Sequence, residues 1–493
     1  MMCIGMFMAI LDVQVVATSL PTIQRALNIA QDQMSWVQTS YLIAEIIAIP
    51  LTGYLTRAFT MRWRFVIAVS AFTLASIACV LSDSFETLIL WRVVQGFSGG
   101  TLIPTVFSAV FLMFPLRLQS VATTIAGVLA VLAPTVGPVV GGWLTETYSW
   151  HWLFLINVLP GVMAAAVACV SLPKEKLNLA QARQLDVPAL LLMACALAAL
   201  EIGIKEAPQP VSVLTGAIFI WRMIRSPHPL VDIRAFRDRN FAVGCLLSFV
   251  TGIGLFGSVY LMPVFLSYVR GHDALEVGKI ILVTGVVQFV AAPIAVAVDE
   301  RFDERYVAAF GILLFGVGMA MSCVQTSATD YDAMFWPQIV RGAAVMFCIL
   351  PSTRLALAHI AKTKIPDASG LFNLMRNLGG AIGIAIIDTI IYTRAPIHAR
   401  SLADRLAAGD IEAAKTLGIP LDLIARSFVE PAARAAVAPL IDKMAFVEAI
   451  NDAWALVAVL TLAVLVAMPL ARTPIWRLMV SIRKGRVQVR HQR

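Results

Sequence analysis

Long apolar runs recur along the whole chain, and they limit its possible folds more than any other feature. Runs of about 18 residues or more are long enough to cross the hydrocarbon core of a bilayer as α-helices. The chain is 59% hydrophobic and only 14% charged, which gives it more apolar surface than a water-soluble fold can bury. The sequence therefore predicts an all-α integral membrane protein that sits in a lipid bilayer.

The spacing of the apolar runs predicts fourteen membrane-spanning helices. The eighth run, 211–224, is close to the lower length limit for crossing a bilayer. The predicted spans are centred on Met8, Ile46, Phe72, Gly99, Ala130, Val162, Ala194, Ala217, Leu255, Gln288, Phe315, Val345, Ile382 and Val459.

The distribution of Lys and Arg predicts the orientation. Short odd-numbered loops carry only Arg25, Lys205, Arg270 and Lys279, whereas the even-numbered loops and the tail carry most of the other loop cations. Positive residues remain in the cytoplasm, so both termini are predicted to be cytoplasmic in an inner-membrane protein. The long loop at about 393–445 then lies outside, and its helix-forming segments are expected to lie on the outer membrane surface.

A weak internal repeat predicts two six-helix bundles. RVVQGFSGGTLIP from Arg92 resembles QIVRGAAVMFCILP from Gln338, and GPVVGG from Gly137 resembles GGAIG from Gly379. These pairs are eight spans apart, which fits two bundles separated by two inserted spans. The predicted divisions are 1–172 for the first bundle, 173–240 for the inserted spans and linkers, 241–471 for the second bundle, and 472–493 for a basic tail. Paired bundles around a central cavity are common in secondary transporters.

Several functional classes are excluded by what the sequence lacks. It has no P-loop, GxSxG, HExxH or Cys/His zinc pattern, so we predict no enzyme activity, no cofactor and no metal site. The seven cysteines lie in apolar runs without CxxC spacing. The net charge of +8 resides mostly in short loops and the tail, as membrane topology requires, so no nucleic-acid partner is predicted.

Charged residues inside the predicted spans are the main functional candidates, because a charge at that depth is costly. Asp12 lies in the middle of span 1, Glu45 in span 2 and Arg92 in span 4. A carboxylate whose exposure changes can gain and lose a proton, so we assign proton coupling to these three residues. The alternative for each is a structural ion pair within the bundle.

A second set of polar residues is predicted to line the substrate cavity. Gln38, Tyr41 and Glu45 share one face of span 2 at helical spacing. Arg376 follows Asn373 by three residues in span 13, where the pair could contact an anionic group. Arg354 is expected to reach lipid phosphates near the inner surface. The predicted cavity residues are Gln14, Gln38, Tyr41, Asn373 and Arg376.

Span 5 contains a stripe of small residues. Ala133, Gly137 and Gly141 recur every four residues, and such a stripe lets another helix approach closely. Prolines in the same helix are expected to bend it. The residues of span 5 that are predicted to allow this close contact or to bend the helix are Pro134, Gly137, Pro138, Gly141 and Gly142.

These motifs resemble the major facilitator superfamily and, within it, the fourteen-span drug:proton antiporters of the EmrB/QacA group. LDVQVVATSLP resembles the group's span-1 signature, with Asp12 and Pro21 in matching places, and RVVQGFSGG resembles the span-4 motif that begins with Arg92. APTVGPVVGG resembles the antiporter motif of span 5, and ASGLFNLMRNLGGAIGIAI resembles the group's span 13. The resemblance implies a proton-coupled exporter of drugs or other small amphipathic compounds.

One departure narrows the resemblance. In the superfamily, the loop between spans 2 and 3 usually contains an aspartate where GYLTRAFTMR, from Gly53, has Arg57. A second copy of this loop follows span 10, and it keeps Asp299 and Arg301. EmrB-like members share this loss, and members of that type work with a periplasmic adaptor and an outer-membrane channel. Two alternatives stay open: an exporter of one metabolite such as a siderophore or fatty acid, and a membrane sensor or scaffold without transport.

Overall fold

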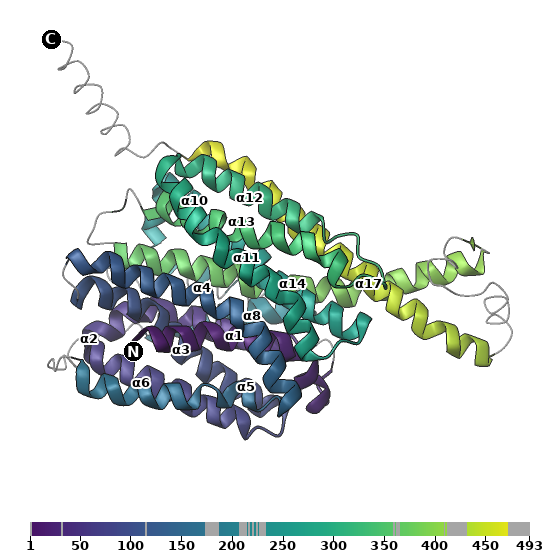
Figure 1. Ribbon diagram of the computed structural model, residues 1–493, viewed down its shortest axis with the longest axis horizontal. Helices are drawn as coiled ribbons and strands as arrows, with labels where there is room; N and C mark the ends of the chain where they lie inside the picture. The colour runs from purple at the N-terminus through teal and green to yellow at the C-terminus, as the bar shows by residue number, and fades with distance from the viewer. Residues whose placement is uncertain are drawn as a thin grey trace, which may run out of the picture.

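The chain folds into long helices that run roughly parallel to one another (Figure 1). The computed structural model describes residues 2–30, 33–113, 116–172, 187–206, 214, 217–218, 221–222, 225, 233–357, 360, 365–408, 410–411 and 431–471. The elements within these ranges are α1 (Met2–Ala26), α2 (Trp36–Val80), α3 (Phe85–Met113), α4 (Leu116–Thr147), α5 (Trp152–Leu155), α6 (Val158–Ser171), α8 (Val187–Glu206), η2 (Ile233–Arg237), α10 (Arg239–Phe265), η3 (Leu266–Arg270), α11 (Ala274–Arg301), α12 (Glu304–Ala320), α13 (Tyr331–Leu357), α14 (Ile365–Ala407), α17 (Pro431–Ala463) and η5 (Val464–Leu470).

The predicted spans correspond to these helices, and the prediction of an all-α membrane protein is confirmed. Spans 2 and 3 both lie in α2, which breaks at Thr60, where the backbone adopts φ 66° and ψ 159°. Eight helical segments within the described ranges are long and apolar enough to cross a membrane, and α12, with 17 residues, is marginally shorter. The eighth predicted span falls largely outside the described residues.

The helices form two groups. Helices α1 to α6 pack mainly against one another, as do α10 to α17, and the two groups meet chiefly where α11 contacts α4 and α14 contacts α2. We call these groups the N-terminal bundle and the C-terminal bundle. Each bundle contains large side chains without solvent exposure, such as Phe72 in the first and Trp454 in the second.

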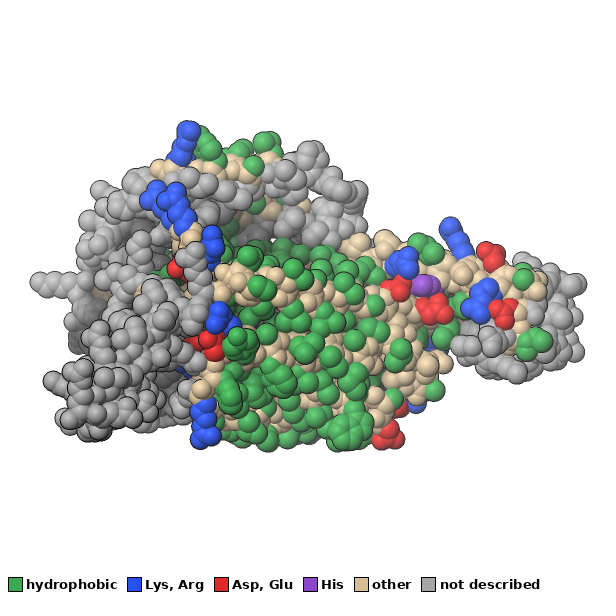
Figure 2. All heavy atoms as spheres, turned by 90° about the horizontal axis from the view of Figure 1, so that it is seen from above, with side chains coloured by type: hydrophobic (Ala, Val, Ile, Leu, Met, Phe, Trp, Pro, Cys, Tyr) green, Lys and Arg blue, Asp and Glu red, His purple; other side chains and the backbone are tan. Residues whose placement is uncertain are grey.

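The outer surface carries an apolar band. Figure 2 shows hydrophobic side chains covering the middle of the molecule, with Lys and Arg at one border and mixed charged residues at the other. Large apolar residues such as Leu74, Val170 and Val466 are more than half exposed. In water this exposure would be unfavourable, but against lipid it is what a membrane-spanning protein needs.

The segments that flank the long outer loop differ from the sequence prediction. Helix α14 runs without interruption to Ala407, and α17 begins at Pro431, so the spans extend as helices and project beyond the rest of the molecule (Figure 1). The two helices are joined near the base by Asp452, which accepts hydrogen bonds from Arg394 at 2.8 Å and His398 at 2.7 Å. The expectation that the whole segment lies on the membrane surface is therefore wrong for its described parts.

Candidate functional site

Asp12 lies at the centre of a polar cluster inside the N-terminal bundle. One carboxylate oxygen accepts a hydrogen bond from Arg92 at 2.5 Å. The other accepts from Gln95 at 2.9 Å and Asn157 at 2.8 Å. Because Asp12 and Arg92 are both fully buried, this is an ion pair shielded from water with its carboxylate oxygens hydrogen-bonded. The elements α1, α3 and the turn before α6 supply these side chains.

Arg92 is held by further contacts from α2. Its Nε donates to the carbonyl of Val37 at 3.0 Å, and its guanidinium stacks over the ring of Tyr41 at 4.4 Å. The sequence indicated both charges but missed Gln95 and Asn157. Gln95 follows Arg92 by three residues on one helix face, which is a usable signal, whereas nothing local marks Asn157.

The predicted polar face of α2 is divided between two environments. Tyr41 turns into the N-terminal bundle, where its hydroxyl donates to the carbonyl of Ala9 at 3.3 Å. Gln38 is fully buried, and its side-chain amide has no hydrogen-bond partner among the described residues. The structure thus separates Tyr41 from the predicted cavity and places it in the cluster around Arg92.

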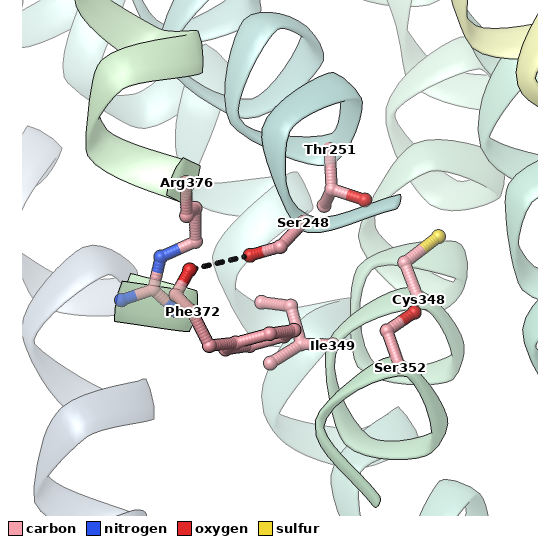
Figure 3. Close-up of a pocket in the computed structure, with 7 residues that line it drawn as sticks. All are labelled: Ser248, Thr251, Cys348, Ile349, Ser352, Phe372 and Arg376. Atoms are coloured by element: carbon pink, nitrogen blue, oxygen red, sulfur yellow. Dashed lines mark hydrogen bonds between the residues drawn. The ribbon is translucent and has the colours of Figure 1, made fainter. Parts of the chain in front are cut away.

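Glu45 lies where the two bundles meet. Its carboxylate lies near the side chains of Asn377 and Arg376, both from α14. Figure 3 shows the guanidinium of Arg376 pointing away from Cys348 and Ser352, which line a narrow pocket within the C-terminal bundle. The sequence placed Glu45 and Arg376 in separate groups, and the structure brings them together across the bundle interface.

Asn373, the other residue of span 13 that was predicted to line the cavity, bonds within its own helix. Asn373 is partly buried and donates to the carbonyl of Ser369 on its own helix at 3.0 Å. The neighbour that reaches Glu45 is Asn377, one helical turn further on, which the sequence did not single out. Residues four apart share a helix face, so Asn373 and Asn377 lie on the same side of α14.

The small residues of α4 contact two other helices. A Cβ on Gly137 would lie 2.6 Å from the Cβ of Gln14, and one on Gly141 would lie 2.8 Å from the Cα of Val15. Gly142 instead faces α11, where a Cβ would lie 2.6 Å from the Cα of Leu275. Pro134 and Pro138 lie inside the same helix, which therefore touches α1 on one side and α11 on the other. These contacts are too close for any larger side chain.

Polar contacts join the bundles at the end that is predicted to be outside. Asp388 accepts hydrogen bonds from Ser35 at 2.9 Å and from Tyr260 at 2.6 Å. The backbone N–H of Ala274 donates to Glu146 at 3.0 Å. Asp388 therefore bonds to a residue of each bundle, and Glu146 adds a second link between them.

The opposite ends of α4 and α14 are less crowded. A Cβ added at Gly127 or Gly370 would meet no atom within 4 Å. The described bundle contacts are therefore tight at the end that is predicted to be outside and looser around Gly127 and Gly370.

The two copies of the loop motif also differ. In the C-terminal copy, Asp299 pairs with Arg354 at 2.5 Å, and Arg354 reaches Glu304 at 3.4 Å. In the N-terminal copy, Arg64 donates to backbone carbonyls, those of Thr52 at 2.8 Å and Thr101 at 3.0 Å. Arg354 thus binds two carboxylates, and the expectation that it reaches lipid phosphates is wrong.

The geometry has no features of a metalloenzyme within the described ranges. No group of three or more His, Cys, Asp or Glu side chains there could hold a metal ion. The polar residues instead form pairs and networks between helices inside an apolar shell. Some of these polar contacts lie inside one bundle, as at Asp12, and others join the two bundles, as at Asp388 and Glu146.

The fold and these contacts define a polytopic secondary transporter. Residues 2–384 match the model of the Major Facilitator Superfamily, and the chain belongs to that family. It is not an enzyme. A bacterial homologue of the human lysosomal transporter Spinster, solved in an inward-facing conformation, shares the fold with a TM-score of 0.60 at 14% identity over 95% of both chains.

Within the family the chain is related to EmrB exporters. It is 38% identical over 410 residues to the colistin resistance protein EmrB of Acinetobacter baumannii, covering 80% of each chain. It is 30% identical over 413 residues to the multidrug export protein EmrB of Escherichia coli, covering 81% of this chain and 80% of that protein. The predicted resemblance to the EmrB/QacA group is thereby confirmed.

Proposed function

We propose that this protein is a proton-coupled antiporter that exports drugs or other small amphipathic compounds across the bacterial inner membrane. Both termini lie in the cytoplasm in this proposal, and the projecting ends of α14 and α17 lie outside. Similarity to the multidrug export protein EmrB of Escherichia coli supports the direction of transport. The observation that carries the coupling is the fully buried ion pair of Asp12 and Arg92.

The ion pair links protonation to a change of conformation. Protonating Asp12 in the observed arrangement would leave the charge of Arg92 buried without its counter-charge, which costs about 3–5 kcal/mol. The protonated protein therefore favours a rearranged state in which Arg92 reaches water or another acceptor. Binding a proton on one side and releasing it on the other then drives the bundles between two orientations.

Glu45 supplies a second charge that senses the bundle arrangement. It lies near Arg376 and Asn377 across the interface, so any movement that separates α2 from α14 changes its surroundings. Gln38 lies on the same helix as Glu45, and its buried side-chain amide has no partner among the described residues. It therefore offers a donor and an acceptor to a substrate that enters between the bundles. Gln14, Asn373 and Arg376 complete the proposed substrate contacts.

The projecting helices give the proposed partners a place to bind. We propose that the ends of α14 and α17 contact a periplasmic adaptor, which would lead substrate to an outer-membrane channel. Their described surface carries the ion pairs of Arg394 with Asp452 and of Arg405 with Asp410, beside exposed apolar residues such as Ile397 and Leu440. A surface that mixes charged and apolar side chains is suited to contact with a protein partner.

The proposal is tested with purified protein in liposomes that hold an imposed pH gradient. Addition of substrate from a panel of cationic, neutral and anionic compounds should dissipate the gradient, and a proton ionophore should abolish substrate accumulation. The same panel in a pump-deleted strain identifies the compounds to which the protein confers resistance. Substrate movement that is unaffected by the gradient would refute antiport.

A further inference from the structure

The C-terminal bundle contains a buried arginine that has no carboxylate partner among the described residues. Arg341 lies on α13 and is only 3% exposed. Its side chain donates to the hydroxyl of Ser322 at 3.3 Å and contacts the sulfur of Met262 at 2.9 Å. The guanidinium lies over the ring of Trp454 at 4.6 Å. None of the described carboxylates forms an ion pair with Arg341.

Three buried N–H groups, on Arg341, on the ring next to it and on a residue of the same helix face, are unused in the described part of the chain. The Nε of Arg341, the Nε1 of Trp454 and the Nε2 of Gln338 have no partner among the described residues. Gln338 precedes Arg341 by three residues on the same helix face, and its oxygen already accepts from Thr284 at 2.9 Å. Gln338 and Trp454 are fully buried, so these donors cannot be satisfied by bulk water.

A positive charge surrounded by unused donors is complementary to an anion. An unpaired buried charge costs several kcal/mol unless a counter-charge is supplied, and buried N–H groups without acceptors add to that cost. One small anion would relieve all of these costs together. The sulfur of Met262 is a weak acceptor on a flexible side chain, so it can yield its place next to the guanidinium.

We propose that Arg341, Trp454 and Gln338 form a binding site for one monovalent anion inside the C-terminal bundle. The anion accepts hydrogen bonds from the guanidinium, the indole N–H and the side-chain amide. It is either a halide or the carboxylate of a bound substrate, since both present a single negative charge to the same donors. The site does not depend on proton coupling at Asp12, because it lies in the other bundle.

The test measures the thermal stability of the purified full-length protein while sodium chloride, sodium octanoate or neutral octanamide is added. An anion that binds only the folded state raises the melting temperature in a concentration-dependent way. We expect the wild type to be stabilised by chloride, by octanoate or by both, and not by octanamide. Arg341→Gln should lose this response.

Two further variants make the result specific. Arg354→Gln removes an arginine on the same helix that already has carboxylate partners, so it should keep the wild-type response to anions. Trp454→Phe keeps a ring over Arg341 but removes the N–H, and should need about tenfold more anion for half-maximal stabilisation, which corresponds to about 1.4 kcal/mol.

The outcomes separate the two sources of the anion. Stabilisation by chloride alone identifies an inorganic anion, stabilisation by octanoate alone identifies a substrate carboxylate, and stabilisation by both shows that they share the site. Equal responses in the wild type and Arg341→Gln would overturn the proposal. If Arg341→Gln does not fold, a response of Trp454→Phe identical to that of the wild type would overturn it instead.

Discussion

The two bundles share a plan of helix contacts but differ in how they neutralise a buried arginine. In the N-terminal bundle, glycines of α4 meet the backbone of α1. In the C-terminal bundle, Gly383 of α14 meets α10 in the same manner, with a Cβ placed 2.9 Å from the Cα of Ile253. The span-4 and span-12 repeats carry Arg92–Gln95 and Gln338–Arg341, with the two residue types in reversed order.

The surroundings of the two arginines share a serine and an aromatic ring but differ in the counter-charge. Ser76 accepts from Gln95 in the N-terminal bundle, and Ser322 accepts from Arg341 in the C-terminal bundle. An aromatic ring from the last helices of each bundle lies near each guanidinium. Asp12, however, has no counterpart at Arg341, where α10 presents Met262. The first bundle thus holds its own counter-charge, and the second depends on one from elsewhere.

The largest effect should come from making the first bundle resemble the second. Asp12→Asn keeps the shape of the side chain but leaves Arg92 without a negative charge. We expect substrate-driven proton exchange in proteoliposomes to fall below about a tenth of the wild-type rate, because the titrating group is lost. Substrate binding should persist. Asp83→Asn, at an exposed position in the same bundle, is the control and should behave as wild type.

A wild-type exchange rate in Asp12→Asn would show that the carrier lies elsewhere. The carboxylate that distinguishes the N-terminal bundle from the C-terminal bundle would then not be needed for proton exchange. Glu45 would become the leading candidate for the proton-carrying group.

The glycine contacts are expected to be equivalent in the two bundles. Gly141→Leu and Gly383→Leu each force a branched side chain against a helix backbone, at Val15 and Ile253 respectively. Both should abolish transport while leaving protein in the membrane, because the helices cannot approach. Gly127→Leu, which meets no atom within 4 Å, is the control. Full activity of Gly141→Leu but not of Gly383→Leu would show that only the second contact matters.

Glu45→Gln should have a smaller effect. The substitution keeps the size of the side chain but removes the negative charge that lies near Arg376 across the interface. We expect a three- to tenfold loss of transport, or a changed preference between cationic and neutral compounds, on the order of 1 kcal/mol. Transport assays with matched cationic and neutral substrates measure this. No change in rate or preference would place Glu45 in a purely structural role.

The sequence predicted the charges of the site better than their partners. Asp12 and Arg92 could be found because a charge within an apolar run is costly and needs a reason. Gln95 and Asn157 are neutral and carry no such signal, and the direction of Tyr41 depends on how α2 packs against α3. The projection of α14 and α17 was missed because helix-forming composition does not distinguish a helix on the membrane surface from one that extends a span.

The smallest effect is expected at the end of the C-terminal bundle that is predicted to be outside, where a cluster of charged residues around His272 joins the start of α11 to the loop before α13. His272 bonds to Asp330 at 2.9 Å and Glu276 at 2.8 Å, and Arg270 bonds to Asp330 at 2.8 Å. Partial burial opposes charging of His272, but the two carboxylates outweigh it and raise its pKa above the usual 6.5. Burial also opposes charge on Asp330, yet hydrogen bonds from His272 and Arg270 lower its pKa to about 2.

The signs of these shifts define a pH window. A histidine whose pKa is raised on folding stabilises the protein fully below pH 6.5, and this contribution disappears as the pH rises through the folded-state pKa. Asp330 stays charged throughout that range. We therefore expect the melting temperature of wild type to exceed that of His272→Gln at pH 5.5, with the difference shrinking by pH 8. The groups are partly exposed, so the difference should amount to only a few degrees. A difference between the two proteins that does not change with pH would show that His272 contributes through packing and not through its charge.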